Sequence, residues 1–366
     1  MDESPSRAQP GAAARGGGAG PPDVDLDGRT LPDGGMPLRS ALALALCSGR
    51  SFRFRQFRSS RAAPGLQREH VACLNAAAAV SGGDTGGAEA GATELQFTPG
   101  AVAHGEHTFG VGSAGNALLL LQMLWPALAS RPGESRLVLR GGTHTVRSPS
   151  FQFVQRAYAP LVDRLGGTSS LRLRRHGFHP TGGGSVEAVL GGAPAGWVPC
   201  DLVDRGPLRE AFAECLVAAV PRHVAARELD TVGRALGWSG DQLRAPLVRQ
   251  NEGPGNALVA TLVWGGVTEV FTAIGEKGVS AENVARGVVR DVRGFLAGEG
   301  ALGPCLAEQW LLAVSVAAWR RGAPAAFTCT AVTAQLRAQA TLVTRFLGVP
   351  VSIEPDGAGW RVTVTP

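Results

Sequence analysis

The stretch GNALLLLQMLWPALASRPGESRLVLRGG, residues 115–142, carries two hydrophobic patterns that decide the fold class. Its first half is a continuous apolar run of helical length that only Gln122 interrupts. Its second half, SRLVLRGG, alternates apolar and polar residues and predicts a β-strand. The helix-like run SFQFVQRAYAPLVDRLGG (150–167) and the strand-like run SLRLRRHGFHP (170–180) follow. Because strands alternate with helices, we expect an α/β architecture.

The same alternation extends in both directions along the chain. Upstream, SFRFRQFR (51–58) predicts a strand whose phenylalanines face a core and whose arginines face outward. Downstream, NALVATLVWGGVTEVFTAIG (256–275) predicts a strand hairpin, and Ser280 is placed to cap the next helix. The segment 333–366 predicts a helix followed by a β-hairpin. A strand–helix–strand–helix pattern therefore recurs at least three times, although the sequence shows no clean repeat.

Composition narrows the class and the surroundings of the protein. The 366 residues suffice for two or three domains, while residues 1–25 are rich in Gly, Ala and Pro and predict a disordered arm. A net charge of +5 favours a polyanionic partner without establishing one. No stretch approaches the roughly 18 apolar residues of a membrane span, so we expect no membrane contact. The six scattered cysteines indicate free thiols in a reducing compartment and predict a cytoplasmic protein without structural zinc.

The loop HGFHPTGGG (176–184) allows three interpretations. Its glycines let backbone N–H groups approach an anion, so the loop could cradle a phosphate. It lacks the spacing of a Walker or dinucleotide loop, and a Gly-rich turn is more often structural. A metal is the weakest interpretation, because no cysteine pair or acidic cluster accompanies His176 and His179.

Two arginines stand where the strand 51–58 passes into a loop. Arg58 and Arg61 are placed to grip phosphates through bidentate hydrogen bonds. The competing interpretation is a solvated basic edge strand that resists aggregation.

Polar residues near the starts of two apolar helices form a further set of candidates. The turn GSAG (112–115) opens the first of these helices, whose free N–H groups predict an anion site. Gln122, farther along that helix, must bind a backbone group or a ligand if it is buried. Glu308 and Gln309 begin the helix CLAEQWLLAVSVAAW (305–319), where they complement the helix dipole or contact a ligand.

Taken together, these stretches resemble the RNA 3′-terminal phosphate cyclase family from about residue 26 to the end of the chain. The resemblance rests on ten ordered segments, namely PDGGMPLRSALAL (32–44), RAAPGLQREH (61–70), GSAGNALLLLQMLWPAL (112–128), RGGT (140–143), HGFHPTGGG (176–184), VPRHVAAREL (220–229), GPGNALV (253–259), EKGVSAENVA (276–285), LAEQWLL (306–312) and TRFLGV (344–349). Their order and spacing are far more specific than any one of them.

The resemblance implies three repeated α/β units, each a four-stranded sheet with two helices, and a smaller inserted α/β domain. The repeated domain would comprise residues 26–192 and 276–366, and the insert 193–275. HGFHPTGGG would then be mainly a structural loop at the end of the second unit.

The resemblance also implies an ATP-dependent reaction on RNA. In the family a histidine attacks the α-phosphate of ATP, AMP passes to an RNA 3′-terminal phosphate, and the neighbouring 2′-hydroxyl closes a 2′,3′-cyclic phosphate as AMP leaves. A divalent cation, Mg²⁺ or Mn²⁺, supports this chemistry. By position, Arg39, Arg58, Arg61, Gln122, Glu308 and Gln309 match residues of the nucleotide site.

Five departures fall within this site. The nucleophilic histidine of the family corresponds to Gln335, and no histidine follows residue 223. Pro32 stands at the metal-binding glutamate, with Asp33 beside it as a possible metal ligand. The other departures are Ala63 for a lysine, Glu69 for a glutamine and Glu308 for an aspartate. The framework matches the family while the active site differs, which indicates altered or lost chemistry.

Three functions compete on these residues. The first is an active cyclase with another adenylated residue, although Lys277 is the only lysine and lacks a ligase motif. The second is a non-catalytic member that binds RNA or nucleotide in RNA processing. The third is an enolpyruvyl transferase-like enzyme, for which phosphate-site lysines are missing. We place the chain in the cyclase class and expect turnover through a histidine adenylate to be absent or severely reduced. The oligomeric state is not predicted.

Overall fold

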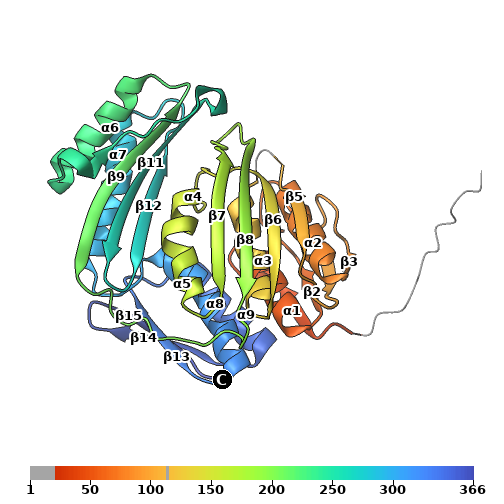
Figure 1. The fold of residues 1–366 in the computed structure, drawn as a ribbon. Helices are drawn as coiled ribbons and strands as arrows, with labels where there is room; N and C mark the ends of the chain where they lie inside the picture. The colour runs from red at the N-terminus through yellow and green to blue at the C-terminus, as the bar shows by residue number, and fades with distance from the viewer. Residues whose placement is uncertain (1–20, 113–114) are drawn as a thin grey trace, which may run out of the picture.

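A computed structural model describes residues 21–112 and 115–366 of the chain. It contains two units in which the elements follow in the order strand, helix, strand, helix, strand, strand, and a third unit that begins at the first helix of this order (Figure 1). A fourth sheet with two helices lies between the second and third units in sequence. The predicted α/β fold is therefore confirmed. Within the described residues no helix is both long and apolar enough to cross a membrane.

The first unit shows why its residues form this arrangement. Phe52 and Phe54 of the second strand are buried, whereas Arg53 between them is exposed, as the alternation predicts. Its elements are β1 (Val24–Asp27), η1 (Gly28–Thr30), α1 (Met36–Ser48), β2 (Phe52–Arg55), α2 (Arg68–Ser81), β3 (Asp84–Gly86) and β4 (Leu95–Thr98). The sheet order is β1-β2-β4-β3, with β1 and β2 parallel. Strand β1 begins at Val24, within the arm predicted for 1–25, and Asp23 already accepts the Ser51 N–H at 2.8 Å; residues 1–20 lie outside the described part.

The second unit repeats this order and contains the stretch 115–142. Its elements are β5 (Glu106–Gly110), α3 (Ala117–Ala129), β6 (Gly133–Gly141), α4 (Phe151–Phe153), the π-helix η2 (Val154–Tyr158), α5 (Ala159–Asp163), β7 (Thr168–Arg175) and β8 (Gly184–Gly192). The sheet order is β5-β6-β8-β7, which matches the first unit strand for strand. The predicted helix and strand of 115–142 are both present, and Pro126 lies within α3.

The third unit keeps the order but reduces its first strand. Its elements are α8 (Pro304–Arg321), β13 (Ala325–Cys329), α9 (Ala334–Leu347), β14 (Val351–Asp356) and β15 (Gly359–Val364). The sheet order is β13-β15-β14, and a single parallel bridge from Leu302 to Cys329 stands where the other units have a first strand. The expected four strands are thus three in this unit. Gly300 passes so close to Cys329 that a β-carbon would lie 2.1 Å from its backbone carbon.

The inserted part has its own sheet and its own hydrophobic core. Its elements are β9 (Leu208–Ala218), α6 (Arg222–Leu236), η3 (Gly240–Gln242), β10 (Leu243–Arg244), η4 (Gln250–Glu252), β11 (Gly255–Trp264), β12 (Thr268–Ile274) and α7 (Ala281–Ala297). The sheet order is β10-β9-β11-β12, and β11 and β12 form the predicted hairpin. Helix α7, capped by Ser280 as predicted, buries Val284, Val288 and Phe295 in this core. The packing therefore favours an end near residue 298 over the predicted boundary at 275.

The four helices α1, α3, α8 and α9 pack together at the centre of the repeated units (Figure 1). The guanidinium groups of Arg131, after α3, and Arg320, in the last turn of α8, both donate to the Cys47 carbonyl near the end of α1. Arg50, after α1, donates to the Arg345 carbonyl near the end of α9. The ends of all four helices therefore lie together, so their starts share the opposite edge.

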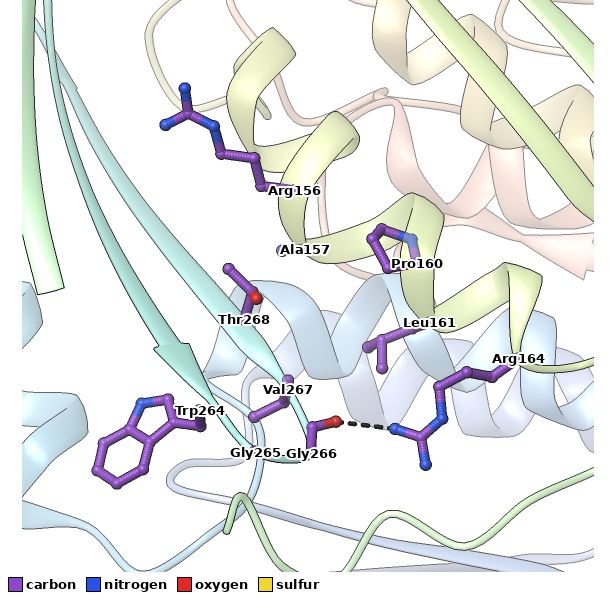
Figure 2. A pocket seen from close by; sticks show the side chains of 10 residues that line it. All are labelled: Arg156, Ala157, Pro160, Leu161, Arg164, Trp264, Gly265, Gly266, Val267 and Thr268. Carbon is purple, nitrogen blue, oxygen red and sulfur yellow. Dashed lines mark hydrogen bonds between the residues drawn. The ribbon is translucent and has the colours of Figure 1, made fainter. Parts of the chain in front are cut away.

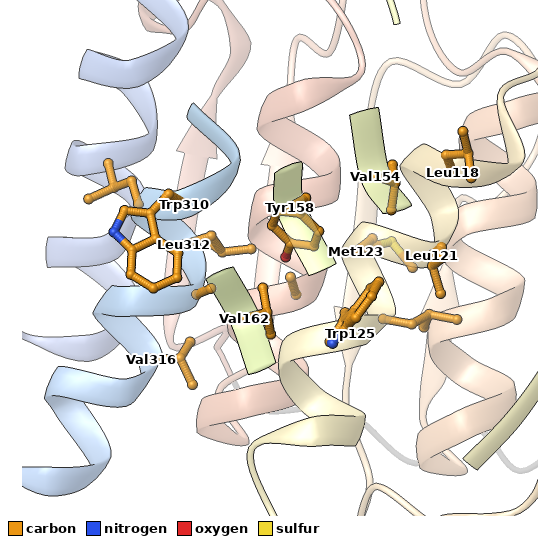
Figure 3. Close-up of a cluster of buried hydrophobic side chains, with 14 of the residues drawn as sticks. Leu118, Leu121, Met123, Trp125, Val154, Tyr158, Val162, Trp310, Leu312 and Val316 are labelled. Carbon is orange, nitrogen blue, oxygen red and sulfur yellow. The ribbon is translucent and has the colours of Figure 1, made fainter. Parts of the chain in front are cut away.

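The core between these helices is closely packed. Trp125 and Trp310 are completely buried, and Trp125 meets the ring of Tyr158 edge-on with centroids 5.3 Å apart (Figure 3). Fully burying an aromatic side chain contributes about 2–3 kcal/mol, so this core fixes the helices relative to one another.

Candidate functional site

The start of α9 lies against the start of α1. The buried side chain of Gln339 on α9 donates to the hydroxyl of Ser40 on α1 across 3.2 Å. Gln335 lies one helical turn earlier on the same face of α9 and is partly buried. Because α1 and α9 run in the same direction, this turn is directed toward the first turn of α1 and the preceding segment Pro32–Gly35. Gln335, predicted to stand at the position of the family's nucleophile, is therefore on the turn of α9 that faces the start of α1.

Glu308 reaches the same place from α8. The hydroxyl of Thr333, the N-cap of α9, donates to Glu308 Oε1 at 2.5 Å and accepts from the Leu336 N–H at 3.0 Å. Burial raises the pKa of Glu308, and the Thr333 hydrogen bond opposes that rise. Of the two predicted residues at the start of α8, Glu308 thus contacts the first turn of α9, two residues from Gln335.

Gly35 lies directly beneath two donor side chains. A β-carbon at Gly35 would approach Arg39 Nη1 to 2.3 Å and His70 Nε2 to 2.6 Å. The buried His70 ring accepts the Gln67 N–H at Nδ1, at 2.9 Å, and a neutral ring must then carry its proton on Nε2. Burial, with smaller effects of Arg39 and Arg58, lowers the pKa of His70 to about 3. Nε2–H has no hydrogen-bond partner among the described residues and adjoins Gly35, although the Glu69 carboxylate lies 3.6 Å from Nε2.

Sequence reasoning assigned no role to His70. The signal available was its position three residues after Gln67, the spacing of a capping box, in which side chain and backbone exchange hydrogen bonds. That spacing predicts the Nδ1 bond. It does not reveal that the other nitrogen is buried and unpaired.

The start of α1 is a ready anion site. Its N-cap, Gly35, provides no side-chain acceptor, so the N–H groups of Met36 and Leu38 have no capping side chain, while Pro37 between them has no N–H. By contrast, Asn116 accepts the Leu118 N–H at the start of α3. At the start of α8 the buried carboxylate of Glu269 accepts the Gly303 N–H at 2.5 Å. Among the first helices of the three units, α1 alone lacks such an acceptor from the described side chains.

Arg58 and Arg61 are placed beside this site by the loop after β2. Arg58 has a left-handed backbone (φ 49°), is partly buried and donates to the Gly65 carbonyl at 3.0 Å. Non-glycine residues adopt this conformation at some energetic cost, and such positions are frequent at functional sites. Arg61 is exposed, with Nε 3.5 Å from Asp33 Oδ2. The loop thus joins the Gly-rich turn through an arginine predicted to bind phosphate.

The surroundings of Asp33 do not fit a metal site built from the protein alone. Its carboxylate lies beside Arg61 and accepts the Ser60 hydroxyl at 2.5 Å. Within residues 21–112 and 115–366 no group of three or more His, Cys, Asp or Glu side chains is arranged to hold a metal ion. We therefore assign no role to a protein-bound metal.

The two predicted glutamines differ in their surroundings. Gln122 on α3 is 4% exposed, and neither its amide nitrogen nor its oxygen has a partner among the described residues. Of the two roles predicted for a buried Gln122, a bond to a backbone group is absent among the described residues, and contact with a ligand stays a prediction. Gln309 on α8 is partly buried. Residues 113 and 114 of the predicted GSAG anion turn lie outside the described part of the chain.

The loop 176–184 is anchored to the insert. His176 Nδ1 lies 2.6 Å from the buried Glu252 carboxylate, and its ring stacks on Phe178 and on His144. Gly182 and Gly183 adopt positive φ angles of 68° and 74°. These contacts accord with the mainly structural role predicted for the loop.

A cavity of about 180 Å³ lies elsewhere, between η2–α5 and the turn from β11 to β12 (Figure 2). Its arginines already have partners: Arg156 bonds to Glu214, and Arg164 donates to the Gly266 carbonyl at 2.8 Å. The cavity therefore offers no unpaired guanidinium to a ligand.

Known proteins resemble this chain over most of its length. The chain matches the model of the family described as RNA 3′-terminal phosphate cyclase over residues 30–353. It is 38% identical over 328 residues to a protein of that name from Ectopseudomonas mendocina, covering 90% of this chain and 94% of that protein. Proteins of the same name from Salmonella enteritidis and Ralstonia nicotianae are 38% and 39% identical, covering 93% and 94% of this chain and 98% and 97% of their own lengths.

Proposed function

Because this chain belongs to the RNA 3′-terminal phosphate cyclase family, we propose that it binds ATP and an RNA 3′-terminal phosphate where α1 and α9 begin. We further propose that the covalent step of the family reaction is lost or severely reduced. One observation supports both parts: the hydrogen bond from Gln339 to Ser40 joins α9, whose first turn carries Gln335, to α1, whose uncapped start adjoins Arg39 and His70.

The binding part is supported by the donors that converge there. Free N–H groups at the start of α1, the Arg39 guanidinium and the His70 Nε2–H all favour negatively charged oxygens. Arg58 and Arg61 add positive charge from the neighbouring loop. A nucleotide brings phosphate groups, and its chemical contribution in the family is the adenylyl group. The chain's own residues supply a cradle for such phosphates.

The loss of the covalent step follows from the chemistry of Gln335. The amide nitrogen of a carboxamide delocalises its lone pair into the carbonyl and does not act as a nucleophile. His70 is not a substitute, because Nδ1 accepts the Gln67 N–H and Nε2 carries the proton. The pKa of His70, lowered to about 3, keeps the ring a neutral hydrogen-bond donor.

The same site supports a second function, namely recognition of RNA ends in RNA processing without turnover. The contacts of Asp33 favour this second function. Arg61 and the Ser60 hydroxyl already contact the carboxylate that is predicted to bind Mg²⁺ or Mn²⁺. The six free cysteines support a reducing, cytoplasmic setting for either function.

The deciding experiment incubates the purified protein with α-labelled ATP, Mg²⁺ or Mn²⁺, and an oligoribonucleotide ending in a 3′-phosphate. Protein-bound AMP and the cyclic phosphate end are followed together, and binding of both ligands is measured separately. We expect binding without either covalent product. Robust turnover would refute the loss of the covalent step, and absence of binding to both ligands would refute the proposal as a whole.

A further inference from the structure

The sheet of the second unit exposes one face (Figure 1). Buried side chains, including Leu137, Leu139 and Val186, alternate along its strands with exposed or partly exposed ones. Residues that pair across neighbouring strands point to the same side, so the register arranges the outward residues in rows. We call this surface the outer face of the second sheet; it comprises residues 106, 108, 110, 134, 136, 138, 140, 168, 170, 172, 174, 175, 185, 187 and 189.

The row closest to the candidate site is basic. Gly110, Arg140, Ser185 and Arg175 are register partners across β5, β6, β8 and β7. Neighbouring strands lie about 4.8 Å apart, so Arg140 and Arg175 stand about 10 Å from each other with small residues between and beside them. Arg172 occupies the next row on β7. The row thus presents guanidinium groups on a flat surface that an extended chain can approach.

This row faces the edge of the molecule that carries the nucleotide site. β5 leads directly into α3, and Asn116 at the start of α3 bridges to Gly142, just after β6. The ends of β5 and β6 therefore adjoin the start of α3. Because α1, α3, α8 and α9 all start at one edge, the row of Arg140 and the uncapped start of α1 share that edge.

The charges on this face are less neutralised than those on the first sheet. On β2 of the first unit, Arg53 pairs with Glu94 at 2.8 Å and Arg55 with Asp25 at 2.5 Å. On the second sheet, Arg136 and Arg174 pair with Glu134 and Glu187, both at 2.7 Å. Arg140 and Arg172 are exposed and form no salt bridge among the described residues, although Glu187, which pairs with Arg174, lies opposite Arg172 in the register.

We propose that the outer face of the second sheet holds the single-stranded RNA whose 3′ end enters the site at α1, with Arg140 and Arg172 contacting its phosphates. The inference rests on the proposed function. The outward positions carry small, aliphatic or charged side chains and no aromatic ring, so the contacts are to the backbone and not to stacked bases. The surface therefore binds RNA with little preference for sequence.

The test replaces both arginines, as R140E/R172E, and measures the affinity for a fluorescent single-stranded oligoribonucleotide with a 3′-phosphate at several salt concentrations. We expect an affinity loss of about tenfold or more, and a salt dependence reduced by about 1.4 in slope, since each lost phosphate contact on a single strand removes about 0.7. The matched control is R286E/R290E on exposed positions of α7, which changes the net charge equally. ATP binding should be retained by both variants.

The outcomes separate the two proposals. The proposed RNA surface would be wrong if R140E/R172E bound RNA as tightly as the wild type, or if the control variant lost as much affinity. The proposed function would stand in both cases. Loss of ATP binding in R140E/R172E would also overturn it, because the face would then not be separate from the nucleotide site. A wild-type protein that binds ATP but no RNA would remove the surface together with the RNA part of the proposed function.

Discussion

The starts of α1 and α8 hold equivalent places in two copies of one folding unit, yet they meet opposite chemistry. The start of α1, at Gly35, lacks a side-chain acceptor and adjoins the donors of Arg39 and His70. The start of α8, at Gly303, is filled by the buried carboxyl group of Glu269 from the insert. Both helix starts attract negative charge. The repeated unit therefore provides a helix start that attracts negatively charged groups in both places. The side chains packed around that helix start decide whether it can bind a ligand.

The largest effect on ATP affinity is expected from a side chain added at Gly35, where α1 begins without a capping side chain. In Gly35→Ala the new methyl group displaces the Arg39 and His70 side chains, because its carbon would lie within 2.6 Å of both. Hydrogen bonds to charged groups contribute about 1.5–3 kcal/mol each, so losing two weakens ATP binding by about 100-fold or more. Equilibrium binding of labelled ATP measures the change.

Gly287→Ala on α7 is the matched control for this substitution. A β-carbon there meets nothing within 4 Å, so ATP affinity should not change and the helix should become slightly more stable. Unaltered ATP affinity in Gly35→Ala would show that the start of α1 is not the phosphate site.

The second largest effect is expected on the pH dependence of stability, from Glu269→Gln at the start of α8. Burial raises the pKa of Glu269 from 4.5 to about 8. Between these pH values the folded wild type keeps a proton that the unfolded chain has released. Its free energy of unfolding therefore falls with rising pH, by up to about 1.4 kcal/mol per unit from this group. The variant lacks this dependence and gains stability over the wild type between pH 6 and 8, which urea unfolding measures.

Glu282→Gln serves as the control for the pH series. Hydrogen bonding to Arg227 lowers the pKa of Glu282 to about 2, so this group stays ionised in folded and unfolded protein above about pH 6. Its substitution should shift stability equally at pH 6 and pH 8. Parallel pH profiles of wild type and Glu269→Gln would contradict the buried carboxyl described at the start of α8.

A smaller change, in the rate of protein adenylation, is expected when a histidine replaces Gln335 near the start of α1. Gln335→His supplies an imidazole, but Pro32, Ala63 and Glu69 still differ from the family. Losing one stabilising contact typically costs a factor of about 100 in rate, so adenylation should stay below about 1% of that of a family cyclase. Protein-bound label from α-labelled ATP provides the measurement. Recovery to ordinary family rates would show that the other departures are neutral.

The smallest effect, on stability and on ATP affinity, is expected from breaking the ion pair between Asp33 and Arg61. In Asp33→Asn, Arg61 loses its carboxylate partner, and since both side chains are exposed or partly exposed the stability cost stays below about 1 kcal/mol. The freed guanidinium should bind ATP phosphates somewhat better, by up to about fivefold. Titration with ATP and Mg²⁺ distinguishes two roles: a weaker affinity in the variant would instead identify Asp33 as a metal ligand.

Much of the fold was predictable because its signals are local. The alternation of Phe52 and Phe54 with arginines predicted β2, and the apolar run with Gln122 predicted α3. The sequence did not show that α7, beyond the predicted boundary at 275, packs on the sheet of the insert, because an apolar face with Val284 and Val288 looks the same whichever sheet it packs on. The missing strand of the third unit depends on the close passage of Gly300 past Cys329, a contact between distant residues.

The site was predictable only where a motif marked it. Gln335 and Arg39 came from the resemblance, and Arg61 also from its place after a strand; their roles stay predictions, and Gln335 lies in the first turn of α9. His70 and Glu269 were missed because their importance lies in burial and in partners far along the chain. Glu269 caps a helix that begins 34 residues later, and no local pattern announces such a bond.

The junction of α1 with α9 has a consequence for how the protein is made. The hydrogen bond from Gln339 to Ser40 spans 299 residues of sequence. At synthesis rates of about 5–20 residues per second, roughly 15–60 s separate the emergence of its two partners. During that interval the apolar face of α1 is not yet covered by α9, so the nascent first unit is prone to non-native contacts. The ligand site is completed last, when the C-terminal helix closes on the first one.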